Sequence, residues 1–224
     1  DDNFGDILAA IEEGRNLRQG IKRTISYLFS SNLGEILVIA AALFLDMPLP
    51  LIAAQIIWMN LVTDTFFDIS LALEPHNPAF MAKGVPSANL IDRRMGIRFL
   101  VVAPLMAAGA FWLFASHRDS LDVARTMALT ALVVFQWFNA WSCRSGSASV
   151  FSVNPFSNKF LLMTLGWVIA LHSAALYVPF FNRVLRTTPL HPREFLPIVL
   201  MALGILMAEE IRKLVMRRKY SNAV

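Results

Sequence analysis

Hydrophobic residues fill most of the chain in long runs that short polar joins separate. Six runs are about 20 residues long, the length that a helix needs to cross a hydrocarbon core of ~30 Å. The joins contain turn formers, as in DMPLP at 46–50 and EPHNP at 74–78. The pattern therefore predicts an all-α fold, a polytopic bundle of six transmembrane helices. The expected spans are Ile25–Leu45, Leu51–Leu73, Ile97–Ser116, Ala124–Cys143, Phe160–Phe180 and Phe195–Ile211.

The residues before the first span have a different character. Their apolar positions recur at roughly helical spacing among charged ones, at Ile7, Leu8, Ile11, Leu17, Ile21 and Ile25. This helix either continues straight into the first span or lies on the lipid headgroups. We expect three parts: a cytoplasmic stalk within 1–24, a membrane domain at 25–215 and a basic cytoplasmic tail at 216–224.

Composition supports a membrane protein. Of the 224 residues 56% are hydrophobic and 16% are charged, which is outside the usual range of a soluble domain. The lipid bilayer is therefore the expected surrounding, and no nucleic-acid partner is expected. The sequence opens DDNFGDILAA, without an initiator Met or a signal-peptide pattern. We expect it to be a piece, or a processed product, of a longer chain.

The 20 basic residues are unevenly distributed. An even number of spans puts both termini on one side, and basic residues favour the cytoplasmic side. Both termini are therefore predicted to be cytoplasmic. The larger set of basic residues then lies on the cytoplasmic side and the smaller set on the opposite side. The larger set is Arg15, Arg18, Lys22, Arg23, Lys83, Arg93, Arg94, Arg98, Arg144, Lys159, Arg212, Lys213, Arg217, Arg218 and Lys219; the smaller set is Arg118, Arg125, Arg183, Arg186 and Arg193.

Three acidic residues lie inside the first two predicted spans: Glu35 in the first, and Asp64 and Asp68 in the second. On insertion scales such a group costs ~2.5–3.5 kcal/mol near the bilayer centre, so the three together cost on the order of 8–10 kcal/mol. Residues of this kind usually face the bundle interior or water and mark an ion or proton path.

The spacing of the polar residues favours one shared site. Asn32 and Glu35 lie on one face of the first span, and Asn60, Thr63 and Asp64 share a face of the second. The short join packs the two spans side by side, so both faces can meet. Amide, hydroxyl and carboxylate oxygens suit a hard cation such as Ca²⁺. No His or Cys belongs to this set of residues, which argues against Zn²⁺ or copper.

Some of these residues have a second interpretation. Asn32 and Thr63 are also typical of polar packing contacts between membrane helices. Asp68 either extends the site or is solvated, or paired, near the cytoplasmic end. Gln136, with Asn139 beside it in the fourth span, fits a ligand role and a packing role equally well.

Several motifs resemble one family. YLFSSNLGE (27–35), QIIWMNLVTD (55–64) and LALEP (71–75) resemble the fifth and sixth membrane helices of type II P-type ATPases, which are cation pumps. DDNFGDILAAIEEGR (1–15) is similar to the end of their phosphorylation domain, which runs into a stalk. TMALTALVVFQWFNAWSCRS (126–145) is similar to the eighth helix of calcium pumps. YVPFFNRVLRTTPL (177–190) and EEIRKLVMRR (209–218) extend the resemblance over essentially the whole chain.

The resemblance implies the membrane half of an ATP-driven cation pump in a bacterial-type cell membrane. In the family, ATP phosphorylates an Asp of a cytoplasmic DKTGT motif, and the stalk transmits this event. The cargo would be Ca²⁺, with Mg²⁺ and ATP acting in the parent chain. The partners would be the phosphorylation, nucleotide-binding and actuator domains and the first four membrane helices. The implied cation ligands are Asn32, Glu35, Asn60, Thr63 and Asp64; Asp68 and Gln136 are further candidates.

The sequence also departs from the family pattern. It contains no DKTGT and no PEGL-type ligand segment, so we expect no ATP hydrolysis by this chain alone. Gln136 stands where two-site calcium pumps have a Glu, which favours a single ion or a monovalent one. After Asp64 the family often has Gly and then Leu-Pro, but this chain has Thr65, Phe66 and Phe67. A helix breaker is therefore missing, while Asp68 could compensate for Gln136.

Other functions stay open at this level. Pumps for Mn²⁺, Na⁺, K⁺ or H⁺ share much of this framework, and a proton pump would need a carboxylate that titrates, such as Asp64 beside Asp68. A non-enzymatic membrane module, or a split subunit that binds a partner chain, is the alternative of another class. A secondary transporter or a channel is a further alternative, and it would require paired half-repeats or broken helices in both halves of the chain, which we do not find in the sequence.

Overall fold

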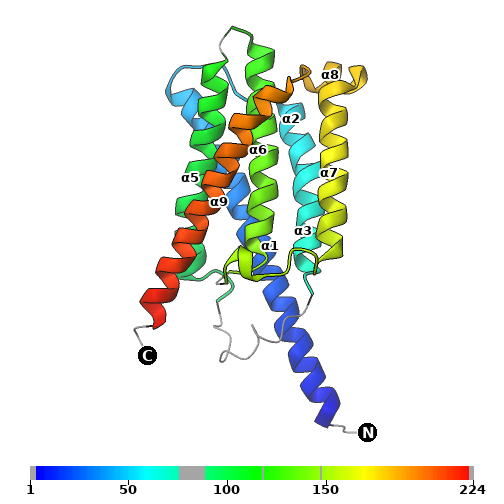
Figure 1. Ribbon diagram of the computed structural model, residues 1–224, viewed down its shortest axis with the longest axis vertical. Helices are drawn as coiled ribbons and strands as arrows, with labels where there is room; N and C mark the ends of the chain where they lie inside the picture. The colour runs from blue at the N-terminus through cyan, green and yellow to red at the C-terminus, as the bar shows by residue number, and fades with distance from the viewer. Residues whose placement is uncertain (1–3, 76–88, 118, 147, 222–224) are drawn as a thin grey trace.

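The computed structural model describes residues 4–75, 89–117, 119–146 and 148–221 (Figure 1). Lys83 and Arg118 of the basic sets lie outside these ranges. All regular structure in the described residues is helical, which confirms the all-α fold. The elements are α1 (Phe4–Phe44), α2 (Ala53–Trp58), the π-helix η1 (Met59–Asp64), α3 (Thr65–Ala72), α5 (Arg93–Ser116), α6 (Leu121–Cys143), the 3₁₀ turn η2 (Val150–Ser152), α7 (Lys159–Tyr177), α8 (Pro179–Leu185) and α9 (Pro192–Ser221).

The first helix joins the predicted stalk to the first predicted span. α1 runs unbroken for 41 residues, and its N-terminal part projects beyond the bundle (Figure 1). Of the two alternatives, the structure therefore has the continuous helix. No break falls at residue 24, so the division of the chain into three parts stays a prediction.

Four helices of the described residues are long and apolar enough to cross a membrane: α1, α5, α6 and α7. The second predicted span is divided into α2, η1 and α3, which follow one another in line (Figure 1). α9 crosses the bundle, but Glu194 lies near the start of its apolar stretch, and Glu209 and Glu210 close it. The number of six transmembrane helices therefore stays a prediction.

The fifth predicted span ends earlier than expected. It was predicted to reach Phe180, but α7 ends at Tyr177 and Pro179 begins α8. A proline disfavours helical backbone at the residue before it. Val178 is accordingly extended, with φ −91° and ψ 123°.

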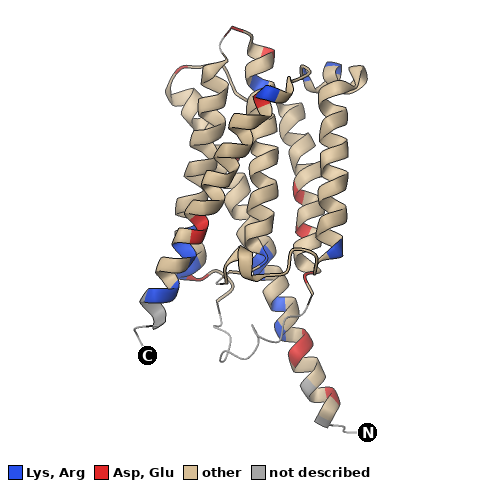
Figure 2. Cartoon of the chain, viewed as in Figure 1, with Lys and Arg blue, Asp and Glu red and all other residues tan. Residues whose placement is uncertain are grey.

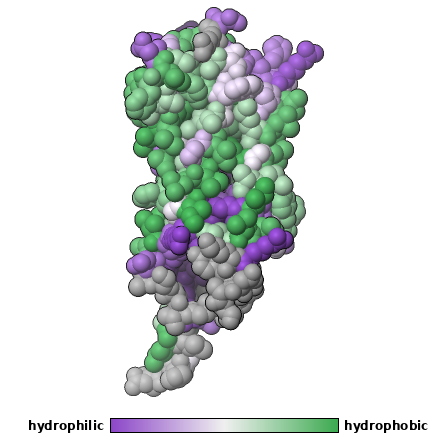
Figure 3. Space-filling model, turned by 90° about the vertical axis from the view of Figure 1, so that its left-hand side faces the viewer, coloured by the Kyte–Doolittle hydropathy of each residue, from purple (hydrophilic) through white to green (hydrophobic). Residues whose placement is uncertain are grey.

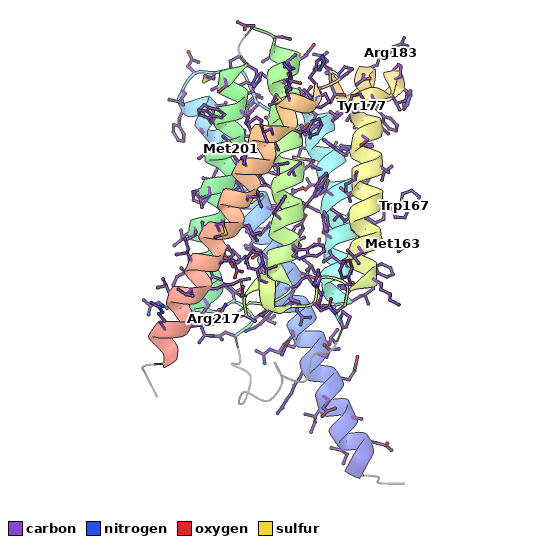
Figure 4. All side chains as sticks on the ribbon, viewed as in Figure 1. Met163, Trp167, Tyr177, Arg183, Met201 and Arg217 are labelled. Carbon is purple, nitrogen blue, oxygen red and sulfur yellow. The ribbon has the colours of Figure 1, made fainter. Side chains whose placement is uncertain are left out.

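α6 is the central helix of the bundle, with neighbours on several sides. It packs against α1, α3, α5, α7 and α9. Apolar side chains also cover the outside of the bundle, as the green face in Figure 3 shows. Met163 and Trp167 of α7 point away from it (Figure 4) and are 51% and 56% exposed. Lipid tails are as apolar as such side chains, so this surface fits a bilayer.

Charged residues gather at the two ends of the bundle (Figure 2). Arg217, of the larger basic set, and Arg183, of the smaller one, lie at opposite ends (Figure 4). α1 begins and α9 ends at the same end (Figure 1). These positions agree with the predicted separation of the basic residues; that the shared end is cytoplasmic stays a prediction.

Two glycines of α1 give a matched test of how closely this helix packs. A Cβ on Gly20 would lie 2.8 Å from the carbonyl oxygen of Ala72, whereas a Cβ on Gly14 would meet nothing within 4 Å. Alanine favours a helix over glycine by about 1 kcal/mol, but overpacking costs about 1–3 kcal/mol. We expect Gly20→Ala to lower the midpoint of thermal unfolding and Gly14→Ala to keep or raise it. Equal midpoints in purified protein would contradict the close packing of α1 on α3.

Candidate cation-binding site

The π-helix η1 interrupts the second predicted span at its polar residues. It covers Met59–Asp64 and so carries Asn60, Thr63 and Asp64. The backbone N–H of Thr65 bonds to the carbonyl oxygen of Asn60, five residues earlier, which is the wider π pattern. Such segments occur frequently at functional sites. The chain therefore widens its helix at the predicted ligand turn without the proline that the family often has there.

Asp64 is held from α1. It is 3% exposed, and the hydroxyl of Tyr27 donates to its Oδ1 at 2.8 Å. Its second oxygen, Oδ2, is buried and has no hydrogen-bond partner within the described part of the chain. Tyr27 is itself fully buried and packs on Phe67, with the ring centroids 5.9 Å apart. One oxygen of Asp64 is thus oriented and the other is available.

Glu35 is held from α6. Nε2 of Gln136 donates to its Oε1 at 2.8 Å, and both side chains are buried. Glu35 lies close enough to Asp64 for the two carboxylates to interact electrostatically. The structure therefore brings α1, η1 and α6 together at one place, as the sequence predicted for Glu35 and Asp64 and left open for Gln136.

Four buried oxygen atoms in this region have no hydrogen-bond partner among the residues that the structure describes. They are Thr63 Oγ1, Asp64 Oδ2, Asp68 Oδ1 and Gln136 Oε1. A buried polar atom without a partner costs about 1–3 kcal/mol, so such atoms are few in a folded protein and ask for an explanation. All four can accept, and oxygen atoms are the ligands of hard cations. The arrangement can therefore bind a cation through carboxylate, amide and hydroxyl oxygens.

Asn32 and Asn60 are less enclosed than the other predicted ligands. Asn32 is half-buried and Asn60 is exposed. The prediction that Asn60 shares a face with Thr63 and Asp64 assumed α-helical spacing, whereas the π pattern turns these residues relative to one another. Within the described ranges, no three His, Cys, Asp or Glu side chains gather closely enough to hold a metal ion. A cation here would therefore also need neutral oxygen ligands.

Tyr27, Ser30 and Ser31 of α1 were not among the predicted site residues. Nδ2 of Asn139 donates to Oγ of Ser30 at 2.9 Å and to Oγ of Ser31 at 3.0 Å. Tyr27, Ser31 and Glu35 are four residues apart and lie on one face of α1. That spacing was the signal that could have placed them together.

Arg98 was counted among the basic residues of the cytoplasmic end, but its side chain is buried between helices. It is only 3% exposed and forms a salt bridge with Glu209 of α9. Its second Nη atom donates to Asn139 Oδ1 at 2.5 Å. A guanidinium group can bridge two acceptors in this way because it presents several donors in a fixed plane.

Comparison with known proteins assigns the chain to a family. The family described as "Cation transporting ATPase, C-terminus" matches residues 48–215. The chain is 35% identical over 209 residues to the "Calcium-transporting ATPase" of Bacillus subtilis, covering 89% of this chain and 23% of the relative. It is 35% identical over 195 residues to the "Probable cation-transporting ATPase F" of Mycobacterium tuberculosis, covering 85% and 22%.

A yeast relative matches almost the whole chain. The "Calcium-transporting ATPase 1" of Saccharomyces cerevisiae is 30% identical over 227 residues, covering 98% of this chain and 24% of the relative. The chain therefore spans about a quarter of the length of these relatives. It belongs to the P-type cation-transporting ATPases, and it is a C-terminal membrane portion of such a protein.

Proposed function

We propose that this chain is the cation-binding membrane part of an ATP-driven pump and that the transported cation is Ca²⁺. The observation that carries the proposal is the group of unpartnered buried oxygens at Thr63, Asp64, Asp68 and Gln136. Two of the relatives named above are called calcium-transporting. Ca²⁺ takes ~6–8 oxygen ligands in flexible geometry, which suits a mixed set of donors.

Each side chain has a role in this proposal. Asp64 is the central ligand through Oδ2, while Tyr27 orients it through Oδ1. Glu35 supplies the second carboxylate, and Gln136 holds Glu35 and offers its own carbonyl oxygen. Thr63 contributes its hydroxyl.

The less enclosed asparagines complete the proposed site from its open side. Asn32 is half-buried and Asn60 is exposed in this chain, which spans about a quarter of its relatives' length. We propose that they face the membrane helices of the parent protein that precede this chain. Gln136 stands where two-site calcium pumps have a Glu, so we propose that the site takes one ion.

α1 is the proposed mechanical link between ATP and the site. It is one helix from Phe4 to Phe44, and it contacts the rest of the chain below the site at several points. Thr24 Oγ1 donates to the carbonyl oxygen of Asp68 at 3.3 Å, and Arg23 Nε donates to that of Arg144 at 3.1 Å. A movement of the stalk part would therefore reach α3 and α6 together with Tyr27.

A proton or a monovalent ion is the second candidate cargo. Asp68 is half-buried, one of its oxygens has no partner, and it interacts electrostatically with Asp64. An extra carboxylate that interacts with Asp64 suits a path on which a proton or a small cation moves between two acidic groups.

The site is tested first by removing its carboxylates in the parent pump. We expect Asp64→Asn and Glu35→Gln to abolish phosphorylation by ATP that depends on the cation, because each removes a negatively charged ligand. Asp122→Asn makes the same change on an exposed carboxylate in the first turn of α6 and should have no effect. Full phosphorylation in both site variants would contradict the site.

The cargo is tested by ATP hydrolysis of the parent pump, with Ca²⁺, Mn²⁺, Na⁺ and K⁺ added singly over a Mg²⁺ background. We expect stimulation by micromolar Ca²⁺ that disappears in Asp64→Asn. Hydrolysis that ignores Ca²⁺ but follows a monovalent ion or pH would overturn the cargo and favour the second candidate.

The orienting role of Tyr27 gives a separate prediction. Tyr27→Phe keeps the buried ring but removes the hydrogen bond to Asp64, and loss of a group that orients a metal ligand typically costs about 10–100-fold in affinity. We expect the Ca²⁺ concentration for half-maximal phosphorylation to rise about tenfold. Tyr177→Phe is the control. The hydroxyl of Tyr177 donates at the same distance, 2.8 Å, to the carbonyl oxygen of Leu190, which lies in the join between α8 and α9. Equal effects of the two variants would contradict the role of Tyr27.

A further inference from the structure

A buried polar network connects α9 with α1 through α5 and α6. Arg98 of α5 bonds to Glu209 of α9 and, at 2.5 Å, to Oδ1 of Asn139 in α6. Asn139 bonds in turn to the hydroxyls of Ser30 and Ser31 in α1. Each of these five residues is at most 3% exposed, so water does not compete for their contacts.

Glu209 fixes the direction of the Arg98 side chain. The carboxylate of Glu209 is shared with Arg212, whose Nε donates to Oε2 at 2.6 Å and whose Nη2 donates to Oε1 at 2.8 Å. Breaking a buried pair by removing one partner is strongly destabilising, because it leaves an uncompensated charge. The pairing with Glu209 therefore holds Arg98 in place.

Arg98 in turn fixes which way the amide of Asn139 faces. A guanidinium group donates hydrogen bonds and does not accept them, so the amide must turn its oxygen toward Arg98. Its NH₂ group then faces α1, where Ser30 and Ser31 accept at 2.9 and 3.0 Å. The carbonyl oxygen of Tyr27 favours the same orientation, since it accepts from Nδ2 of Asn139 at 3.5 Å.

The network ends beside the residues that hold the two carboxylates. Ser30 and Ser31 lie between Tyr27, which donates to Asp64, and Glu35, which accepts from Gln136. Gln136 is three residues before Asn139 on α6, so both side chains face α1. The contact between Asn139 and the serines therefore fixes the register of α1 on α6 between the two hydrogen bonds of the site.

We propose that Asn139 and Arg98 are positioning residues for the cation site. They hold the α1 segment 27–31 against α6, and thereby place Asp64 and Glu35 at the separation at which both bind one cation. α9 takes part through Glu209, although it supplies no ligand. This inference rests on the proposed function, because it assigns a role relative to that site.

The test uses the full parent pump and the Ca²⁺ concentration for half-maximal phosphorylation. Asn139→Leu removes the hydrogen bonds of Asn139 to Arg98 and to the two serines, while the new side chain has a similar volume. We expect the half-maximal Ca²⁺ concentration to rise about tenfold and the maximal phosphorylation per folded pump to stay unchanged. Arg98→Lys keeps the charge but does not hold Glu209 and Asn139 in one plane, so it should cause a smaller rise. It also keeps the test available if Asn139→Leu fails to fold.

The control variant removes a different buried hydrogen bond of α6, the helix that carries Asn139. Nε2 of His172 in α7 lies 3.2 Å from Oγ1 of Thr130 in α6, and this contact does not reach α1. Thr130→Val should leave the half-maximal concentration unchanged. An equal rise in Thr130→Val and Asn139→Leu would mean general loosening of α6 and would overturn the positioning role.

A double variant identifies the route of the effect. If Asn139 acts through the segment that carries Tyr27, then Tyr27→Phe with Asn139→Leu should raise the half-maximal concentration by less than the product of the single effects, because groups that act as a unit are not additive. Effects that multiply would overturn this route.

Asp64→Asn separates this inference from the proposal on which it rests. If Asp64→Asn abolishes the response to Ca²⁺ while Asn139→Leu and Arg98→Lys leave it unchanged, the site stands and the positioning role falls. If Asp64→Asn keeps the full response, the site falls and the positioning role falls with it.

Discussion

The hydrogen bond from Tyr27 to Asp64 joins the long helix α1 to the π segment, and it requires the same register of α1 as the other polar contacts of this helix. Ser30 and Ser31 reach Asn139, and Glu35 reaches Gln136, only if α1 sits at this height against its neighbours. Apolar packing alone would not fix that height, because lipid and helix surfaces are similarly apolar. The buried polar groups of α1 therefore decide how the central helices fit together.

These contacts leave the polar groups only partly satisfied. Asp64 and Gln136 each pair on one atom and keep a buried oxygen without a partner. A sequence selected for stability alone would pair or remove these atoms, and the places where a protein breaks such rules are expected to be functional. The two hydrogen bonds orient the groups, and the remaining oxygens are what a cation would bind.

Much of the fold follows from the sequence, because long apolar runs and their charged ends constrain helices strongly. The meeting of Glu35 and Asp64 also followed, since their spans are adjacent and their polar faces had to turn inward. Asn60 shows the limit of this reasoning: a π segment changes the spacing between residues, and no residue pattern indicated one. Arg98 shows a second limit. Periodicity predicts which face of a helix is buried but not which other helix covers it, so the partners of Arg98 on α6 and α9 were not predicted.

The proposed link from stalk to site requires more than one stiff helix. α1 continues without a break from Phe4 to Phe44, so a tilt of its outer part would shift the whole face that carries Tyr27 and Glu35. Such a shift changes binding only if the partners on α6 and η1 hold a second arrangement, since packed cores switch between discrete states rather than deform continuously. In the proposed pump the unpartnered oxygens would allow such a second arrangement, because a carboxylate that loses one hydrogen bond has another acceptor atom to present.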